Sequence, residues 1–166
     1  GEYNNTVGQV LLTRRVIDDP RLRENAYNTF EELINMCIIP VVNENDSVSI
    51  EELLNGDNDC LSATVAELID ADLLVMLTDT DGLYDSNPSE NPDAKLIPVV
   101  KEITPEIEAV AGGAGEKGTG GFATKVKAAK IANNAGIPVV VMNGVTPKKI
   151  YNVLDGENVG TKFLPN

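Results

Sequence analysis

The stretch "CLSATVAELIDADLLVMLTDTDG", residues 60–82, carries the two patterns that decide the fold class. Its first half is a predicted helix with apolar residues on one face: Leu61, Val65, Leu68 and Ile69. "DLLVML", residues 72–77, is apolar without alternation, which is typical of a parallel strand covered on both faces by helices. The polar turn "TDTDG" then ends this strand. A helix followed by a fully buried strand indicates an α/β protein.

The same alternation continues on both sides of this stretch. A helix capped by Asp19-Pro20 and the strand "IIPVV", residues 38–42, come before it. The segments that follow it are a helix from Thr104, a helix over 122–136, the strand "IPVVVM" over 137–142, a helix from Pro147 to about Leu154, and a strand over 159–164. We therefore predict a three-layer α/β/α sandwich with a mostly parallel sheet, in a single domain over residues 1–166. Ligands of such folds bind at the carboxyl ends of the strands.

Composition excludes several classes of function. The chain has 166 residues and a formal charge of −13, which argues against nucleic acid as a partner, because binding it requires many Lys and Arg residues. No apolar run approaches the ~20 residues that cross a bilayer, so we expect no membrane association and a cytoplasmic protein. The two cysteines are too few for a disulfide framework. The chain has no histidine, so its chemistry must proceed without imidazole.

Short polar groups follow three of the predicted strands. "NEND" begins at Asn43, "TD" at Thr78 and "NG" at Asn143, and the carboxyl ends of parallel strands meet at one rim of a sheet. The amides and carboxylates near the first of these are Asn43, Asn45, Asp46, Asn58 and Asp59. Without arginine among them, this set suits a cation such as an ammonium group, and Lys125 is an equally good partner for Asp59.

Some of the acidic residues nearby have a structural explanation. Ser49 with Glu51 and Glu52 fits a capping box, and Asp57 or Asp59 is a plausible N-cap of the helix that follows.

The segment "GTGGFATK", residues 118–125, is a candidate anion site. Its glycines allow a backbone that presents several N–H groups, and the positive end of the next helix lies directly behind them. If that helix begins near Phe122, Lys125 lies in its first turn and leans back toward the bound anion. Thr119 offers a further hydroxyl donor. The alternative is a flexible surface loop followed by an ordinary amphipathic helix.

Thr78 and Asp79 end a buried strand and offer a second polar site. A carboxylate there could position a nucleotide directly, through water, or through Mg²⁺, which proteins usually hold with one or two carboxylates plus phosphate oxygens. The alternative is turn chemistry, in which Asp81-Gly82 makes the turn and Asp79 caps it.

Three motifs in order, "NEND", "GDND.LSA" and "GTGG..TK", resemble those of the glutamate 5-kinases. These enzymes are one group of the amino acid kinase family, which also includes acetylglutamate, carbamate, aspartate and UMP kinases. The resemblance extends from Gln9 to Phe163. It implies phosphorylation of the γ-carboxylate of L-glutamate by ATP, with Mg²⁺, to give L-glutamyl 5-phosphate in the first step of proline biosynthesis. It also implies homo-oligomers and feedback inhibition by proline.

The resemblance also assigns roles to residues. Asp46 and Asn58 would hold glutamate, with Asn43 nearby, while Asp59 would organise Lys125, which neutralises the phosphoryl group in transit. The residues implied in ATP binding are Thr78, Asp79, Thr119, Gly120, Gly121, Phe122, Ala123, Thr124 and Lys125. No residue is assigned as a metal ligand. The absence of histidine fits this reaction, because a carboxylate with a solution pKa near ~4.3 is ionised at neutral pH and needs no general base.

The chain departs from the family pattern at its start. Family members begin with a strand and a Lys-containing, Gly/Ser-rich phosphate loop, so we expect a fold that is incomplete at the N-terminal side. We expect this polypeptide alone to be weakly active or inactive, with an exposed sheet edge or apolar face. The alternatives are a non-catalytic sensor of an amino acid or nucleotide, another member of the family, or the kinase half of a bifunctional protein.

Overall fold

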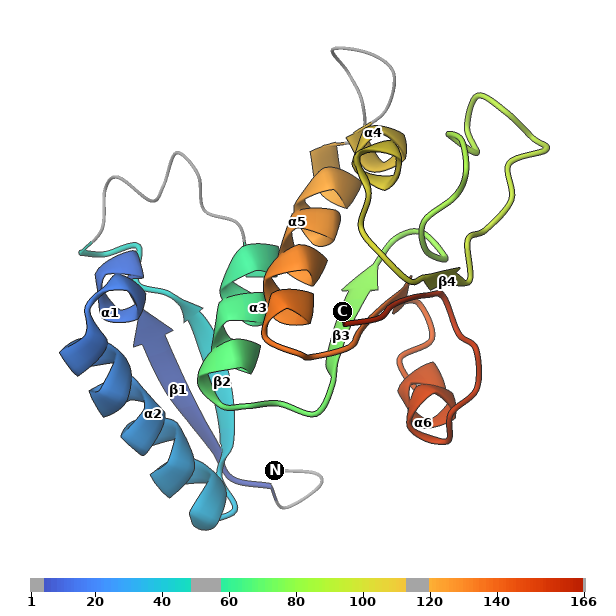
Figure 1. Ribbon diagram of the computed structural model, residues 1–166. Coiled ribbons are helices and arrows are strands. Elements are labelled where there is room, and N and C mark those ends of the chain that lie inside the picture. The colour runs from blue at the N-terminus through green and yellow to red at the C-terminus, as the bar shows by residue number, and fades with distance from the viewer. Residues whose placement is uncertain (1–4, 49–57, 113–119, 166) are drawn as a thin grey trace.

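The structure, a computed structural model, describes residues 5–48, 58–112 and 120–165 (Figure 1). Its strands are β1 (Val7–Leu12), β2 (Ile39–Glu44), β3 (Leu74–Thr78), β4 (Val99–Val100), β5 (Val139–Asn143) and β6 (Thr161–Phe163). Its helices are α1 (Arg14–Asp18), α2 (Pro20–Asn35), α3 (Asn58–Leu68), α4 (Pro105–Gly112), α5 (Gly120–Asn134) and α6 (Lys149–Leu154). Among the described helices, none combines the length and the apolar character needed to cross a membrane.

Within the described residues the strands form two sheets. β1 pairs with β2, and the other four strands run in the order β3-β5-β6-β4. The pairs β1/β2, β3/β5 and β4/β6 are parallel, and β5/β6 is antiparallel. The pairing is therefore mostly parallel, as predicted. In Figure 1, α3 and α5 lie side by side between the β1/β2 pair and β3.

The start of α2 follows from its sequence. The Asp19 carboxylate accepts hydrogen bonds from the backbone N–H groups of Arg21, at 2.9 Å, and Leu22, at 3.2 Å. Pro20 occupies the first helical position, where its missing N–H costs nothing. Phe30, 1% exposed, anchors the helix in the core beneath β1 and β2. The predicted capped helix is confirmed.

Helix α3 joins two hydrophobic cores. The face predicted from the sequence packs with the core below β1 and β2, through Leu61, Val65 and Leu68, together with Ile69 just beyond the helix. The opposite face consists of small residues, Ala63 and Ala66, which are buried against the second core. α5 faces them with Ala128, Ala129 and Ala132, all fully buried. Alanine on both helices permits the close contact of α3 with α5.

Strand β5 is the most buried strand of the second sheet. Val139, Val140, Val141 and Met142 are at most 3% exposed, with β3 on one side and β6 on the other. This confirms the prediction of a buried strand in "IPVVVM". The prediction that "DLLVML" is covered on both faces is wrong, because β3 lies at the edge of its sheet, Met76 is its only buried residue and Leu77 is 44% exposed.

One face of the β1/β2 pair is apolar and exposed. Val10 and Val42 alternate inward toward α2, while Val7 and Val41 on the other face are 61% and 52% exposed. Leu11 and Ile39 extend the same exposed face. Parallel strands are normally covered on both faces, and no residue of the described ranges covers this one. The exposed apolar face expected from the sequence is present.

Three elements were not predicted: β1, α1 and β4. α1 has five residues and no side-chain cap, and β4 has two residues, so neither carries a periodic pattern. Several boundaries also differ by one to three residues; among the helices, α5 begins at Gly120 rather than near Phe122, and α6 at Lys149 rather than Pro147.

The loop between β3 and β4 is closed by Asp85. Its carboxylate accepts a hydrogen bond from the Lys95 N–H at 2.9 Å, and its own N–H donates to the Lys95 carbonyl at 3.0 Å. The backbone hydrogen bond from Lys95 is the main cause that lowers the pKa of Asp85 below its ordinary value of 3.8. Next to this pair, Tyr84 and Leu96 form an antiparallel β-bridge that also joins the two ends of the loop.

Replacing Asp85 by alanine should therefore have a pH-dependent effect. A carboxyl group whose pKa is lowered by folding stabilises the protein above its unfolded pKa, and that contribution is lost as the pH falls through the folded pKa. We expect Asp85→Ala to lower the free energy of unfolding at about pH 7 and to lower it less at about pH 3. Urea denaturation at both pH values measures this. Asp93→Ala, in the same loop, is the control; equal losses at both pH values in Asp85→Ala would contradict the account.

Candidate functional site

The start of α3 and the second turn of α5 are joined by an ion pair. Lys125 Nζ lies 3.0 Å from Asp59 Oδ2, and the two side chains are only 13% and 24% exposed. The Thr124 hydroxyl donates a hydrogen bond to the same Asp59 oxygen at 2.7 Å. The contact between Lys125 and Asp59 that the sequence suggested is thus present. We call these three residues the α3/α5 cluster.

The backbone explains why Asp59 takes this position. Asp59 is the second residue of α3, inside the helix, so its prediction as an N-cap is wrong; Asp57, the alternative, is outside the described residues. A carboxylate in the first turn is favoured by the positive end of the helix, and its side chain remains available to a neighbouring element. That neighbour is α5, which packs along α3.

The start of α5 is suited to an anion. The first four N–H groups of a helix have no partner within the helix, and here they belong to Gly120, Gly121, Phe122 and Ala123. Lys125 lies in the second turn rather than the first, because the helix starts two residues earlier than predicted. Helical side chains lean toward the N-terminus, so an ammonium at Lys125 can still support an anion at the helix start.

A second cluster forms where β3 and β5 end. The Gly144 N–H donates to the Thr78 carbonyl at 2.8 Å, and Asn143 Nδ2 donates to Asp81 Oδ1 at 3.1 Å. The Thr78 hydroxyl donates to Asp79 Oδ1 at 3.1 Å. The predicted meeting of "TD" and "NG" at one rim is therefore confirmed, whereas "NEND", predicted at the same rim, ends the strand β2 of the other sheet. The contact of Asn143 with Asp81 was not predicted, although the polar "NG" after a buried strand had placed Asn143 at this rim.

The β3/β5 cluster fits a nucleotide with Mg²⁺ better than a metal held by protein alone. Across the described residues no group of three or more His, Cys, Asp or Glu side chains could hold a metal ion. Asp79 and Asp81 give two carboxylates, which is the usual protein contribution when phosphate oxygens complete the shell of Mg²⁺. The buried hydroxyl oxygen of Thr80, between them, lacks a hydrogen-bond partner among the described residues. A buried orphan hydroxyl in this turn is a group that a ligand or water would satisfy.

The residues predicted to hold glutamate are exposed. Asn43 is the residue before the last in β2, Asp46 lies in the turn after this strand, and Asn58 begins α3 directly before Asp59. Within residues 5–48, 58–112 and 120–165, no hydrogen bond or ion pair joins these three to Lys125 or Asp79.

The predicted ATP segment is described only in part. Thr119 lies outside the described residues, as do Ser49, Glu51 and Glu52 of the predicted capping box. The Phe122 side chain packs against the core, which leaves its backbone N–H for the predicted contact with ATP, and Ala123 is exposed.

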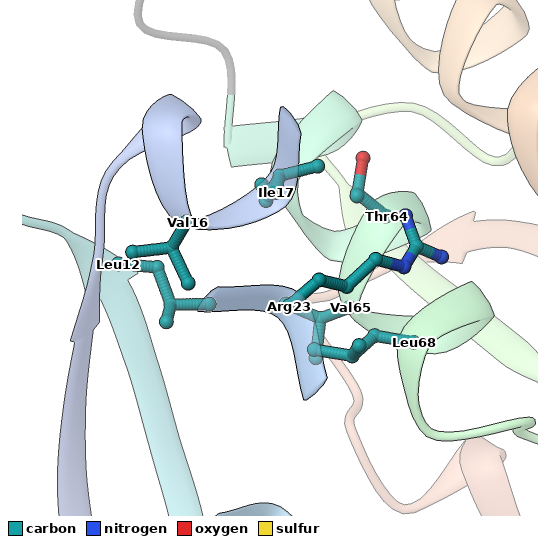
Figure 2. A pocket seen from close by; sticks show the side chains of 7 residues that line it. All are labelled: Leu12, Val16, Ile17, Arg23, Thr64, Val65 and Leu68. Carbon is teal, nitrogen blue, oxygen red and sulfur yellow. The ribbon is translucent and has the colours of Figure 1, made fainter. Parts of the chain in front are cut away.

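A pocket elsewhere in the structure has a different character (Figure 2). It lies between α1, α2 and α3, and its cavity volume is about 10 Å³. Its walls are Leu12, Val16, Ile17, Arg23, Thr64, Val65 and Leu68. Arg23 forms an ion pair with Glu67 at 2.9 Å, so the rest of the pocket wall is mostly aliphatic. The pocket is smaller than usual ligand sites of ~300–1,000 Å³, and we interpret it as a gap in helix packing.

Comparison with known proteins identifies close relatives in sequence. The chain is 51% identical to the glutamate 5-kinase of Clostridium perfringens over 169 residues, which cover 99% of this chain and 63% of that protein. It is 55% identical to the glutamate 5-kinase of Listeria innocua over 168 residues, which cover 98% of this chain and 61% of that protein. The chain therefore spans about three fifths of the length of these relatives.

Solved structures share the fold at low sequence identity. The isopentenyl phosphate kinase of T. acidophilum superposes with a TM-score of 0.62 at 20% identity, over 98% of this chain and 61% of that one. The UMP kinase of Ureaplasma parvum superposes with a TM-score of 0.61 at 19% identity, over 98% of this chain and 62% of that one. These likenesses confirm the α/β/α sandwich. A sequence model of the amino acid kinase family matches residues 2–143, and the chain belongs to that family.

Proposed function

We propose that the protein containing this chain transfers the γ-phosphoryl group of ATP to the γ-carboxylate of L-glutamate, giving ADP and L-glutamyl 5-phosphate. This would be the first step of proline biosynthesis. The observation that carries the proposal is the identity of 51% and 55% to two glutamate 5-kinases over nearly the whole chain. The geometry of the α3/α5 cluster supports it, because a lysine and a helix start converge where an anion can bind.

The chain's own residues would act by charge and position. A carboxylate oxygen of glutamate attacks the γ-phosphorus, and the bond from that phosphorus to the bridging oxygen of ADP breaks. Lys125, held by Asp59 at 3.0 Å, would stabilise negative charge on the transferring oxygens. The N–H groups at the start of α5, from Gly120 onward, would hold the phosphates. No proton has to be removed from the ionised nucleophile.

The remaining assignments complete the proposed site. Thr78 and Asp79, with Asp81, would bind the nucleotide, and bound Mg²⁺ would neutralise part of the phosphate charge. Asn43, Asp46 and Asn58 would bind glutamate, whose ammonium group matches their acceptor oxygens. The exposure of these three residues is compatible with a substrate that enters from solvent.

A panel of phosphoryl acceptors tests the proposal. The full-length protein is incubated with ATP and Mg²⁺, and ADP release is measured with L-glutamate, N-acetylglutamate, aspartate, carbamate, UMP or isopentenyl phosphate. We expect release that depends on glutamate. Activity with another acceptor and none with glutamate would overturn the proposal. Calorimetric binding of glutamate or ATP without any ADP release would instead support a sensor.

Three further features belong to the proposal and rest on the resemblance to glutamate 5-kinases. They are feedback inhibition by proline, assembly into homo-oligomers and a cytoplasmic location. Adding proline to the same assay and measuring the mass in solution by light scattering test the first two, and cell fractionation tests the third.

A further inference from the structure

The hydroxyl of Thr124 and the ammonium of Lys125 share one acceptor atom. Both donate to Asp59 Oδ2, at 2.7 Å and 3.0 Å. Thr124 and Lys125 are consecutive on α5, and consecutive helical side chains normally point in different directions. Here Asp59 lies between them because α3 packs closely along α5. Two donors on one oxygen hold Asp59 Oδ2 in position between the two side chains.

The contact made by Thr124 differs from those of the other threonines in the described helices. The hydroxyls of Thr29 and Thr64 donate to backbone carbonyls one turn earlier in their own helices, both at 2.9 Å. Such bonds are common and only local. Thr124 instead donates to a carboxylate 65 positions away, on another helix, in a partly buried setting. A hydroxyl has a single proton, so in this geometry it is directed at Asp59 and not at a phosphate.

We propose that Thr124 is a positioning residue, whose hydroxyl orients the Asp59 carboxylate so that Asp59 in turn directs the Lys125 ammonium toward the transferring phosphoryl group. This inference rests on the proposed function and adds a role that the ATP-binding assignment of Thr124 does not contain. The ammonium has three donors, and one of them is directed at Asp59. Fixing Asp59 therefore fixes the direction of the other two.

The inference predicts which kinetic parameter changes. If Thr124 acted by binding ATP, its loss would raise KM for ATP. If it positions Asp59 and Lys125 for phosphoryl transfer, its loss should lower kcat by roughly 10- to 100-fold and leave KM for ATP within about 2-fold. Thr124→Ser keeps the hydroxyl and should recover most of kcat.

The experiment compares Thr124→Val and Thr124→Ser in the full-length protein by ADP release at varied ATP. Thr64→Val is the matched control, since it removes a hydroxyl from α3 that contacts backbone alone, and its kcat should match the wild type. In an Asp59→Asn background Thr124→Val should add little further loss, because the two act through one contact. A raised KM with unchanged kcat, equal losses in Thr124→Val and Thr124→Ser, or additive losses with Asp59→Asn would overturn the inference.

A second measurement separates this inference from the proposed function. The coupling between Thr124→Val and Asp59→Asn is also measured by urea unfolding, which needs no enzymatic activity. A wild-type protein that is inactive with glutamate and shows clear coupling would refute the function and leave the contact intact. An active protein without coupling in either measurement would refute the positioning role alone.

Discussion

Replacing Lys125 by alanine is expected to lower kcat/KM for glutamate phosphorylation by roughly 10- to 150-fold. A hydrogen bond to a charged group contributes ~1.5–3 kcal/mol, and losing that much stabilisation of the transition state lowers the rate by this factor. The charge matters because Lys125 is the cation that the α3/α5 cluster presents at the start of α5. Its removal also takes the ammonium group away from Asp59, which is 24% exposed.

Steady-state ADP release measures this effect, and a second lysine of α5 provides the control. Lys130 pairs with Glu108 at 2.6 Å, but the two side chains are 53% and 46% exposed. Surface pairs of this kind contribute ~0–1 kcal/mol, so Lys130→Ala should keep turnover within about 3-fold. If Lys125→Ala turned over as fast as Lys130→Ala, Lys125 would have no part in the mechanism.

The largest expected effect on stability is that of Gly160→Ala. Gly160 has φ of +69°, and a Cβ built there would lie 2.1 Å from the carbonyl oxygen of Val141 in the buried strand β5. Backbone cannot yield as a flexible side chain does, and β6 begins at the next residue. The pairing of β5 with β6 must therefore shift, and we expect a loss of about 3 kcal/mol or more in the free energy of unfolding.

Gly156→Ala is the matched control for this prediction. Gly156 also has a positive φ, +84°, but a Cβ there meets no atom within 4 Å. Its substitution costs only the backbone conformation, about 1–2 kcal/mol. Urea denaturation measures the free energy of unfolding of both variants, and the difference between their losses is the cost of the steric clash at Gly160. Equal losses would contradict the packing described around Gly160.

Much of the fold could be predicted because its patterns are local. The apolar face of α3 is a periodic signal, and it packs partly buried against the core below β1 and β2. The uninterrupted apolar run of β5 is a continuous signal, and it is buried as predicted. The Asp19-Pro20 start of α2 is a local capping signal. The division of the strands into two sheets and the antiparallel β6 could not be predicted, since strand order depends on partners far apart in the chain.

The site was predictable in its residue types and less so in its contacts. The glycine-rich start of α5 and the acidic residues near α3 suggested Lys125 and Asp59 as partners, and their contact is present. The role of Thr124 was not visible, because its distinguishing feature is a hydrogen bond across 65 positions of sequence. The side chain of Asn143 was missed for the same reason, since its partner Asp81 belongs to another strand end.

Trapping the product shows whether the protein transfers a phosphoryl group to the γ-carboxylate of glutamate. The full-length protein, ATP, Mg²⁺ and L-glutamate are incubated with hydroxylamine, which converts an acyl phosphate to a hydroxamate. We predict γ-glutamyl hydroxamate, identified by mass spectrometry, in an amount equal to the ADP released and strongly reduced in Lys125→Ala. Release of ADP without this hydroxamate, or a hydroxamate of the α-carboxylate, would contradict the account.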